Sequence, residues 1–255
     1  MKKKIIILFF IVTSFVILFW FNYITQRTLP EIPSPIIVGT SADFKPFSFK
    51  ENDKIVGLDI DIVNEVCRRL GQPLILKDMP FELLIPQLQL GTIHMVAAGL
   101  TATPARAERV LFAPPHLTGD QLVVVSLASN APVTSLKDLE GKEVIVNQGY
   151  TADVYMSQFP GIKIRRLGTV SDAFLALSHG RGYAYVIASQ AVKPFFEKNN
   201  ITDYNVFILE EAAETVSLAL CKEYPMLAQK VASIITDMVE DGTIQHYKEA
   251  WLSHD

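Results

Sequence analysis

The stretch FELLIPQLQLGTIHMVAAGLTATPARAERVLFAPP, residues 81–115, is the part of this chain that decides its fold. It predicts a helix over residues 81–90, a strand over residues 93–97, a turn of small residues and then a second helix. The second helix begins after Thr103, a good N-cap residue, and Pro104 suits its first position, where the missing N–H costs nothing. Helices and strands that alternate in this way are typical of an α/β fold.

Arg106 lies in the first turn of the second helix. A cation at this end opposes the helix dipole, so its presence needs a local reason. Free backbone N–H groups at a helix start, together with a fixed guanidinium, make a site for a carboxylate. An ordinary surface arginine is the alternative, and the spacing alone does not decide between the two.

The N-terminus forms a separate segment of the chain. Three lysines, residues 2–4, precede an apolar run over residues 5–24. At about 1.5 Å per residue, this run is long enough to cross a bilayer core of about 30 Å. No small-residue cleavage site precedes Pro30, so we favour an uncleaved signal anchor over residues 1–24 to a cleaved signal peptide. The lysines would stay in the cytoplasm and residues 25–34 would form a tether. We therefore expect a periplasmic or other extracytoplasmic protein, held at the inner membrane.

Composition limits the classes of function. The chain has 255 residues, 49% of them hydrophobic, and a net charge of −4, which suffices for two modest lobes. No run of Lys and Arg is interleaved with aromatic residues, which argues against a nucleic-acid partner. The five histidines are scattered, so we expect neither a metal nor another cofactor. Cys67 and Cys221 either pair in an oxidising compartment or remain buried thiols.

Strand and helix patterns alternate through the rest of the chain, in two similar series. Helix, glycine and strand over residues 81–97 are echoed by the same order over residues 174–187. The pattern predicts parallel sheets covered by helices, in two lobes of similar topology. Ligands of open α/β sheets lie at the carboxyl ends of the strands. A common crevice is therefore expected around residues 41–44, 97–101, 147–151 and those after 187.

Four motifs together resemble the polar amino-acid-binding proteins of ABC importers, solute-binding protein family 3. They are VGTSADFKPFSF (38–49), VGLDIDIVNEVCRRLG (56–71), the stretch 81–115 and NQGYTADVY (147–155). The resemblance implies an α/β fold of two doubly wound lobes joined by a two-crossover hinge, periplasmic-binding-protein-like, type II. Lobe 1 would comprise residues 35–121 and 214–255, and lobe 2 residues 122–213.

The resemblance also implies the ligand contacts in lobe 1. Phe44 and Phe81 match two aromatic residues that enclose the ligand side chain, although both could instead belong to the core. Arg106 matches the arginine that grips the ligand α-carboxylate. Thr101 matches a hydroxyl residue that bonds the same ligand, and Gly99 offers a backbone N–H or C=O.

Two further regions are implied to contact the ligand or its arginine. In lobe 2, Thr151 and the amide groups of Gly149 and Tyr150 would reach the carboxylate and couple binding to closure. Asp59 would lie near the cleft arginine, with a purely N-capping role for its helix as the alternative.

The chain departs from the family at the acid that usually holds the α-ammonium group. That position is Ala188, and Ser41 likewise replaces an aspartate found in some members with basic ligands. A buried ammonium without a counter-charge is costly. Either another acid near the second crossover approaches, with Glu214 the best candidate, or the ligand is not a standard α-amino acid.

The leading interpretation is a monomeric, non-enzymatic protein that captures an amino acid (polar, basic ones included) or a related small carboxylate. It would deliver this solute to an ABC permease. An exported enzyme similar to prephenate or arogenate dehydratases would use the same scaffold, but it requires a cleft acid. The strand ends expected at the cleft carry none. A ligand-sensing domain, or a structural domain without a ligand, is also compatible with the sequence.

Overall fold

The computed structural model describes residues 32–198 and 202–252. The expected anchor over residues 1–24 and most of the tether therefore lie outside the described residues. In the described part of the chain, no helix is both long and apolar enough to cross a membrane.

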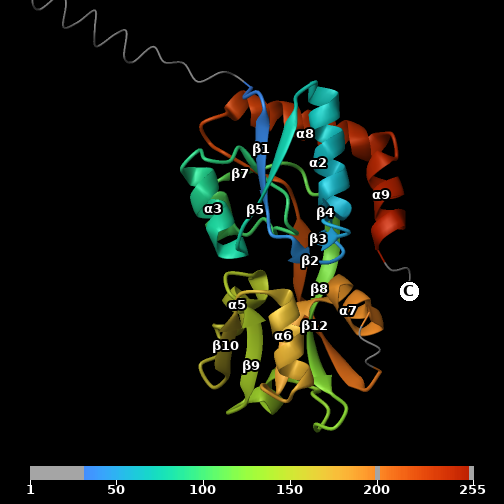
Figure 1. Cartoon of the computed structure of the whole chain (residues 1–255). Helices are drawn as coiled ribbons and strands as arrows, with labels where there is room; N and C mark the ends of the chain where they lie inside the picture. Colours follow the sequence, from blue (N-terminus) through green and yellow to red (C-terminus); the bar gives the residue numbers. More distant parts are fainter. Residues whose placement is uncertain (1–31, 199–201, 253–255) are drawn as a thin grey trace, which may run out of the picture. The chain divides into compact units, whose positions relative to one another are not determined.

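Lobe 1 is built on a five-stranded sheet with the order β5-β1-β6-β13-β7 (Figure 1). β1 pairs in parallel with β5 and β6, whereas β13 is antiparallel to β6 and β7. The strands are β1 (Ile36–Thr40), β5 (Leu74–Asp78), β6 (Met95–Val96), β7 (Leu111–Phe112) and β13 (Ala219–Leu220). The helices are α2 (Leu58–Leu70), α3 (Phe81–Gln89), α4 (Pro104–Ala107), α8 (Pro225–Glu240) and α9 (Thr243–Trp251).

The helices of lobe 1 follow the apolar periodicity of the sequence. Leu58, Ile62 and Val66 recur on one face of α2 and are fully buried. A small antiparallel sheet that was not predicted from the sequence precedes α2. It contains β2 (Asp43–Phe44), β3 (Ser48–Glu51) and β4 (Lys54–Val56). It holds Asp43 and Phe44 at the carboxyl end of β1.

Lobe 2 contains a second five-stranded sheet with the order β10-β9-β11-β8-β12. Its strands are β8 (Leu117–Leu127), β9 (Glu143–Asn147), β10 (Lys163–Leu167), β11 (Ala184–Ala188) and β12 (Tyr204–Val216). Its α-helices are α5 (Thr151–Met156), α6 (Val170–Ser178) and α7 (Val192–Lys198), and two 3-10 helices are η1 (Leu136–Leu139) and η2 (Ser189–Ala191). β9 is parallel to β10 and β11, whereas β8 runs antiparallel to β11 and β12.

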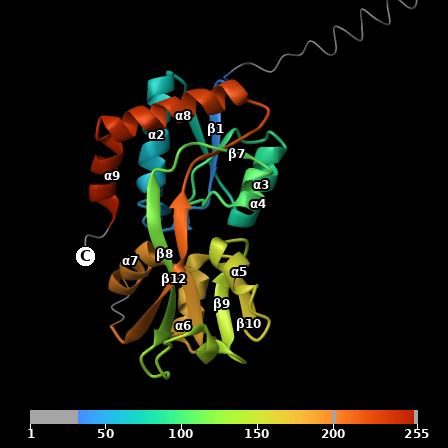
Figure 2. The same ribbon diagram turned by 180° about the vertical axis from the view of Figure 1, so that it is seen from behind.

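β8 and β12 are the long strands that connect the lobes (Figures 1 and 2). They pair from Leu117 opposite Val216 to Leu127 opposite Tyr204, with register shifts near Glu214. β12 is one continuous strand, because the charged residues within 210–214 continue it instead of ending it.

The core residues of the lobe 2 sheet alternate between its two faces. Val123, Val125 and Ile145 face the larger apolar cluster, whereas Leu122 and Val124 face a smaller one. Cys67 and Cys221 are free and buried, so they are thiols and not a disulfide. Burial raises the pKa of the Cys67 thiol to about 11.

Candidate functional site between the two lobes

Arg106 is held rigidly at the start of α4. As predicted, Thr103 is the N-cap, and its hydroxyl accepts a hydrogen bond from the Arg106 backbone N–H at 3.3 Å. The guanidinium donates from Nη1 to the Thr101 carbonyl at 2.8 Å and from Nη2 to the Gly149 carbonyl at 2.9 Å. It also lies 5.5 Å from the centre of the Phe81 ring. A buried cation therefore bridges lobe 1 and lobe 2.

The guanidinium of Arg106 stays protonated although the residue is only 8% exposed. Burial lowers the pKa of its guanidinium to about 10, while the charge of Glu214 opposes that shift. Arg106 is therefore a cation at neutral pH, in a place where water contributes little screening.

Asp59 holds the turn that follows β6. Its Oδ2 accepts a hydrogen bond from the Gly99 N–H at 2.7 Å, and its Oδ1 lies 2.9 Å from Nε2 of His116. The N-cap of α2 is Gly57, so the N-capping interpretation of Asp59 was wrong. The carboxylate instead uses the Gly99 N–H, which leaves the Gly99 carbonyl as that residue's backbone group for a ligand.

Gly99 is required at this turn for two reasons. Its φ of +61° lies in the left-handed region, and an added Cβ would lie 2.5 Å from the Phe44 ring. The glycine therefore lets the turn approach Phe44 closely, at the edge of the cleft.

Glu214 lies on β12 and is 6% exposed. The Thr101 hydroxyl donates to its Oε1 at 3.2 Å. Burial raises the pKa of Glu214 to about 7, and the charge of Asp120 acts in the same direction. The hydroxyls of Thr101 and Thr151 and the charge of Arg106 lower it. The carboxyl group therefore titrates near neutral pH.

Asp120 is a second buried carboxyl group, which was not identified from the sequence. It pairs with Glu214 across β8 and β12 and is 4% exposed. Its Oδ1 accepts from the Ser189 hydroxyl at 2.8 Å and from the Gln190 N–H at 3.3 Å. Its Oδ2 has no partner among the described residues. An aspartate two residues before the apolar run over 122–125 was the available signal.

The aromatic residues meet in an arrangement that the sequence did not predict. Phe44 and Phe81 both contact the ring of Tyr150, at centroid distances of 5.5 Å and 4.1 Å. Tyr150 is the N-cap residue of α5 and is 7% exposed. From the sequence, only the backbone amide of Tyr150 had an expected role. Its side chain, however, lies against both rings that were expected to enclose the ligand side chain.

A small cavity of about 10 Å³ lies at this meeting point. It is lined by Phe44, Phe81, Gly99, Leu122, Tyr150, Thr151, Ala152, Ile187, Ala188 and Glu214. The structure thus brings Thr151, Glu214 and Ala188 together with both phenylalanines and Tyr150. Four of the expected site residues are outside this lining: Ser41, Asp59, Thr101 and Arg106. The Ser41 hydroxyl donates to Oδ1 of Asp43 at 3.0 Å.

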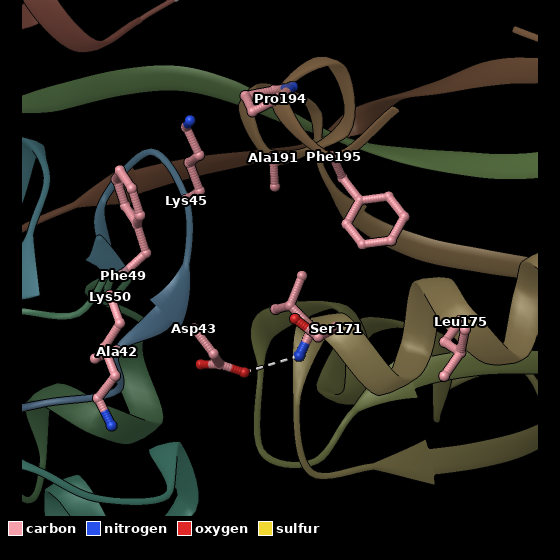
Figure 3. A pocket seen from close by; sticks show the side chains of 11 residues that line it. Ala42, Asp43, Lys45, Phe49, Lys50, Ser171, Leu175, Ala191, Pro194 and Phe195 are labelled. Carbon is pink, nitrogen blue, oxygen red and sulfur yellow. Dashed lines mark hydrogen bonds between the residues drawn. The ribbon is translucent and has the colours of Figure 1, made fainter. Parts of the chain in front are cut away.

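A larger cavity of about 440 Å³ lies between the β2–β3 region of lobe 1 and α6, η2 and α7 of lobe 2 (Figure 3). At its wall, Oδ2 of Asp43 accepts a hydrogen bond from the Val170 N–H at 2.8 Å, the dashed line in Figure 3. Burial raises the pKa of Asp43, and this hydrogen bond opposes the shift. Asp43 therefore makes a second polar link between the lobes.

The described residues contain no group of three or more His, Cys, Asp or Glu side chains that could hold a metal ion. The site does contain the carboxyl groups of Glu214 and Asp120. Of these two acids only Glu214 was expected from the sequence, and β8 adds Asp120, so the lack of an acid at the expected strand ends gives no ground for excluding an enzyme. Comparison with known proteins separates these functions.

Residues 36–254 match the family described as bacterial extracellular solute-binding proteins, family 3. The arginine-binding extracellular protein ArtP of Bacillus subtilis (strain 168) is 30% identical over 223 residues, which cover 86% of each chain. The ABC transporter arginine-binding protein 1 of Escherichia coli (strain K12) is 26% identical over 84% of this chain and 89% of its own.

Solved structures of similar proteins have the same fold. An ancestral arginine-binding protein bound to arginine has a TM-score of 0.80 and 30% identity, covering 87% of this chain and 99% of its own. An ancestral arginine-binding protein bound to glutamine has a TM-score of 0.81 and 31% identity, covering 86% of this chain and 98% of its own.

Fold and sequence thus define a two-lobed, type II periplasmic-binding-protein-like protein. The chain belongs to the bacterial extracellular solute-binding proteins, family 3. This confirms the resemblance, the fold class and the interpretation as a non-enzymatic solute-binding protein of amino-acid transport.

Proposed function

We propose that the protein binds an α-amino acid between its lobes, with Arg106 on the α-carboxylate and Glu214 on the α-ammonium group. One observation carries this assignment: Thr101 contacts both charged groups, since its carbonyl accepts from Arg106 and its hydroxyl donates to Glu214. Thr101 therefore bonds to both a buried cation and a buried acid. A zwitterionic amino acid carries the two complementary charges, a carboxylate and an ammonium group, on one carbon atom.

The remaining contacts follow from the cavity. Thr151 and the Gly99 carbonyl would supply polar contacts to the ligand, while Phe44 and Phe81 would contact its side chain. Asp59 would act indirectly, by fixing Gly99. Ser41 would act through Asp43. Similar proteins are named for binding arginine, histidine or L-cystine, which supports an amino acid as the class of solute.

Closure of the lobes would accompany binding. The bonds from Arg106 to the Gly149 carbonyl and from the Val170 N–H to Asp43 both join lobe 1 to lobe 2. β8 and β12 would act as the hinge, with residues 35–121 and 214–255 moving against residues 122–213. The closed, loaded protein would act as a monomer at the extracytoplasmic face and deliver the amino acid to an ABC permease. The apolar run over residues 5–24 would tether it to the inner membrane.

Calorimetric titration of the full-length protein with a panel of L-amino acids tests the ligand class. Analogues that lack only the carboxylate or only the ammonium group should bind at least tenfold more weakly, because each leaves a buried charge unpaired. Arg106→Gln should abolish the preference for the carboxylate. Arg109→Gln, which alters a neighbouring arginine bonded to Gln89, is the matched control and should bind as the wild type does. An Arg106→Gln variant that still prefers the carboxylate would contradict the assignment.

A further inference from the structure

The side chain of Tyr150 occupies the space in which the proposed function places the side chain of the ligand. Its ring contacts Phe81 and Phe44, the two residues expected to enclose that ligand side chain. The cavity that remains beside the three rings is about 10 Å³. This is roughly the space needed for a single water molecule. A ligand side chain of several carbon atoms and the Tyr150 ring cannot both occupy it.

The backbone on either side of Tyr150 is fixed. The Gly149 carbonyl accepts from Arg106, and the Gly149 N–H donates to Oδ2 of Asp153 at 3.0 Å. Asp153 is itself held by Nε of Arg166 at 2.8 Å. Because these bonds fix the start of α5, Tyr150 cannot move away from Phe44 and Phe81 through a simple shift of its backbone.

Packing alone does not explain a tyrosine at this position. Its hydroxyl is buried, and the hydroxyl of Ser41 lies near enough to lower its pKa, against the larger effect of burial, which raises it. Asp43, Glu214 and Glu82 lie near enough for their charges to disfavour ionisation of the hydroxyl. The hydroxyl therefore lies among polar groups that a phenylalanine at this position could not contact.

We infer that Tyr150 is a specificity-determining residue, whose ring fills the side-chain half of the site and selects amino acids with short side chains. This rests on the proposed function, because it takes the positions of the α-carboxylate and α-ammonium groups from Arg106 and Glu214. A long side chain must displace the ring from between Phe44 and Phe81, whereas a short one leaves it in place.

The test compares the wild type with Tyr150→Ala, each as the full-length protein, by calorimetric titration with L-serine and L-arginine. The quantity measured is the ratio of the two dissociation constants. Removal of the ring should shift this ratio toward arginine by at least about tenfold, the smallest effect of opening an apolar pocket by a carbon atom or more. Tyr155→Ala is the control, since Tyr155 lies on the same helix but packs against Phe159. It should leave the ratio unchanged. An unchanged ratio in Tyr150→Ala would overturn the inference.

A series measured on the wild type alone covers the case in which Tyr150→Ala does not fold. The ligands are L-alanine, L-norvaline and L-norleucine, which differ only in the length of an apolar side chain. If the Tyr150 ring fills the space beside Phe44 and Phe81, affinity should stay constant or fall along the series. Affinity that rises about tenfold for each added carbon would show that this space is open to the ligand side chain, and it would overturn the inference. If no amino acid binds to any of these proteins, the proposed function fails as well, whereas binding with the wrong ratio refutes only the role of Tyr150.

Discussion

Replacing Glu214 with glutamine should stabilise the ligand-free protein at pH 8 and at the same time abolish tight binding. Burial and the neighbouring Asp120 raise the pKa of Glu214 from 4.5 to about 7. At about 1.4 kcal/mol per pKa unit, holding this carboxylate ionised costs roughly 3 kcal/mol of folding free energy. Glutamine carries no charge and keeps an acceptor for the Thr101 hydroxyl, so it removes most of that cost.

The sign of the pH dependence follows from the raised pKa. Above pH 7, Glu214 is ionised in both folded and unfolded protein, and the full cost is present. As the pH falls from 7 toward 4.5, the folded protein takes up a proton first and the cost disappears. The stability advantage of Glu214→Gln should therefore be about 3 kcal/mol at pH 8 and close to zero near pH 4.5.

Urea unfolding of both proteins between pH 4.5 and pH 8 measures this difference. Glu210→Gln, an exposed residue on the same strand, is the control and should show no such pH-dependent gain. Titration with the preferred amino acid should show a loss of about 2–5 kcal/mol for Glu214→Gln, because the ligand ammonium loses its counter-charge. A variant less stable than the wild type at pH 8, or one that binds normally, would refute the reasoning.

Four other outcomes are expected. Arg106→Ala should weaken amino-acid binding by about 2–5 kcal/mol in calorimetry, and affinity within threefold of the wild type would exclude Arg106 as the carboxylate clamp. Affinity of the wild type should rise from pH 5.5 to pH 7.5 and then level off, since only ionised Glu214 pairs with the ammonium; a flat profile would contradict this. Asp43→Ala should speed ligand dissociation in stopped-flow, because closure loses its link to the Val170 N–H; an unchanged rate would remove Asp43 from closure. N-terminal sequencing of the mature protein should begin at Met1, and a start within residues 25–35 would show cleavage instead.

Local sequence signals predicted the fold well, because they depend on neighbouring residues. Thr103 and Pro104 mark the start of α4, and the periodic apolar residues of α2 mark its buried face. Arg106 was identifiable for the same reason: a cation in the first turn of a helix conflicts with the dipole and indicates an outside partner. Such signals require no knowledge of how distant segments meet.

The errors concern groups brought together from distant parts of the chain. Asp59 binds the Gly99 N–H, forty positions away, and Asp120 meets Glu214 only because β8 and β12 pair. Tyr150 could be placed at a helix start from sequence, but the direction of its ring depends on the packing of lobe 2 against lobe 1. Each of these features arises from tertiary pairing, for which a single sequence gives no period or spacing.

The position of the acid pair links charge recognition to lobe closure. Glu214 and Asp120 lie opposite each other on the two strands that connect the lobes. Two buried carboxylates repel one another, so each raises the cost of ionising the other. A ligand ammonium beside Glu214 would relieve that repulsion within the hinge strands themselves, and it would do so most strongly when the lobes exclude water.

A ligand shifts a conformational equilibrium only through its different affinity for the two states. On the proposed assignment, the ammonium supplies that difference at the hinge, while the carboxylate supplies it at Arg106, where the guanidinium also contacts lobe 2. A solute with both charges would therefore favour closure more than one that carries either charge alone.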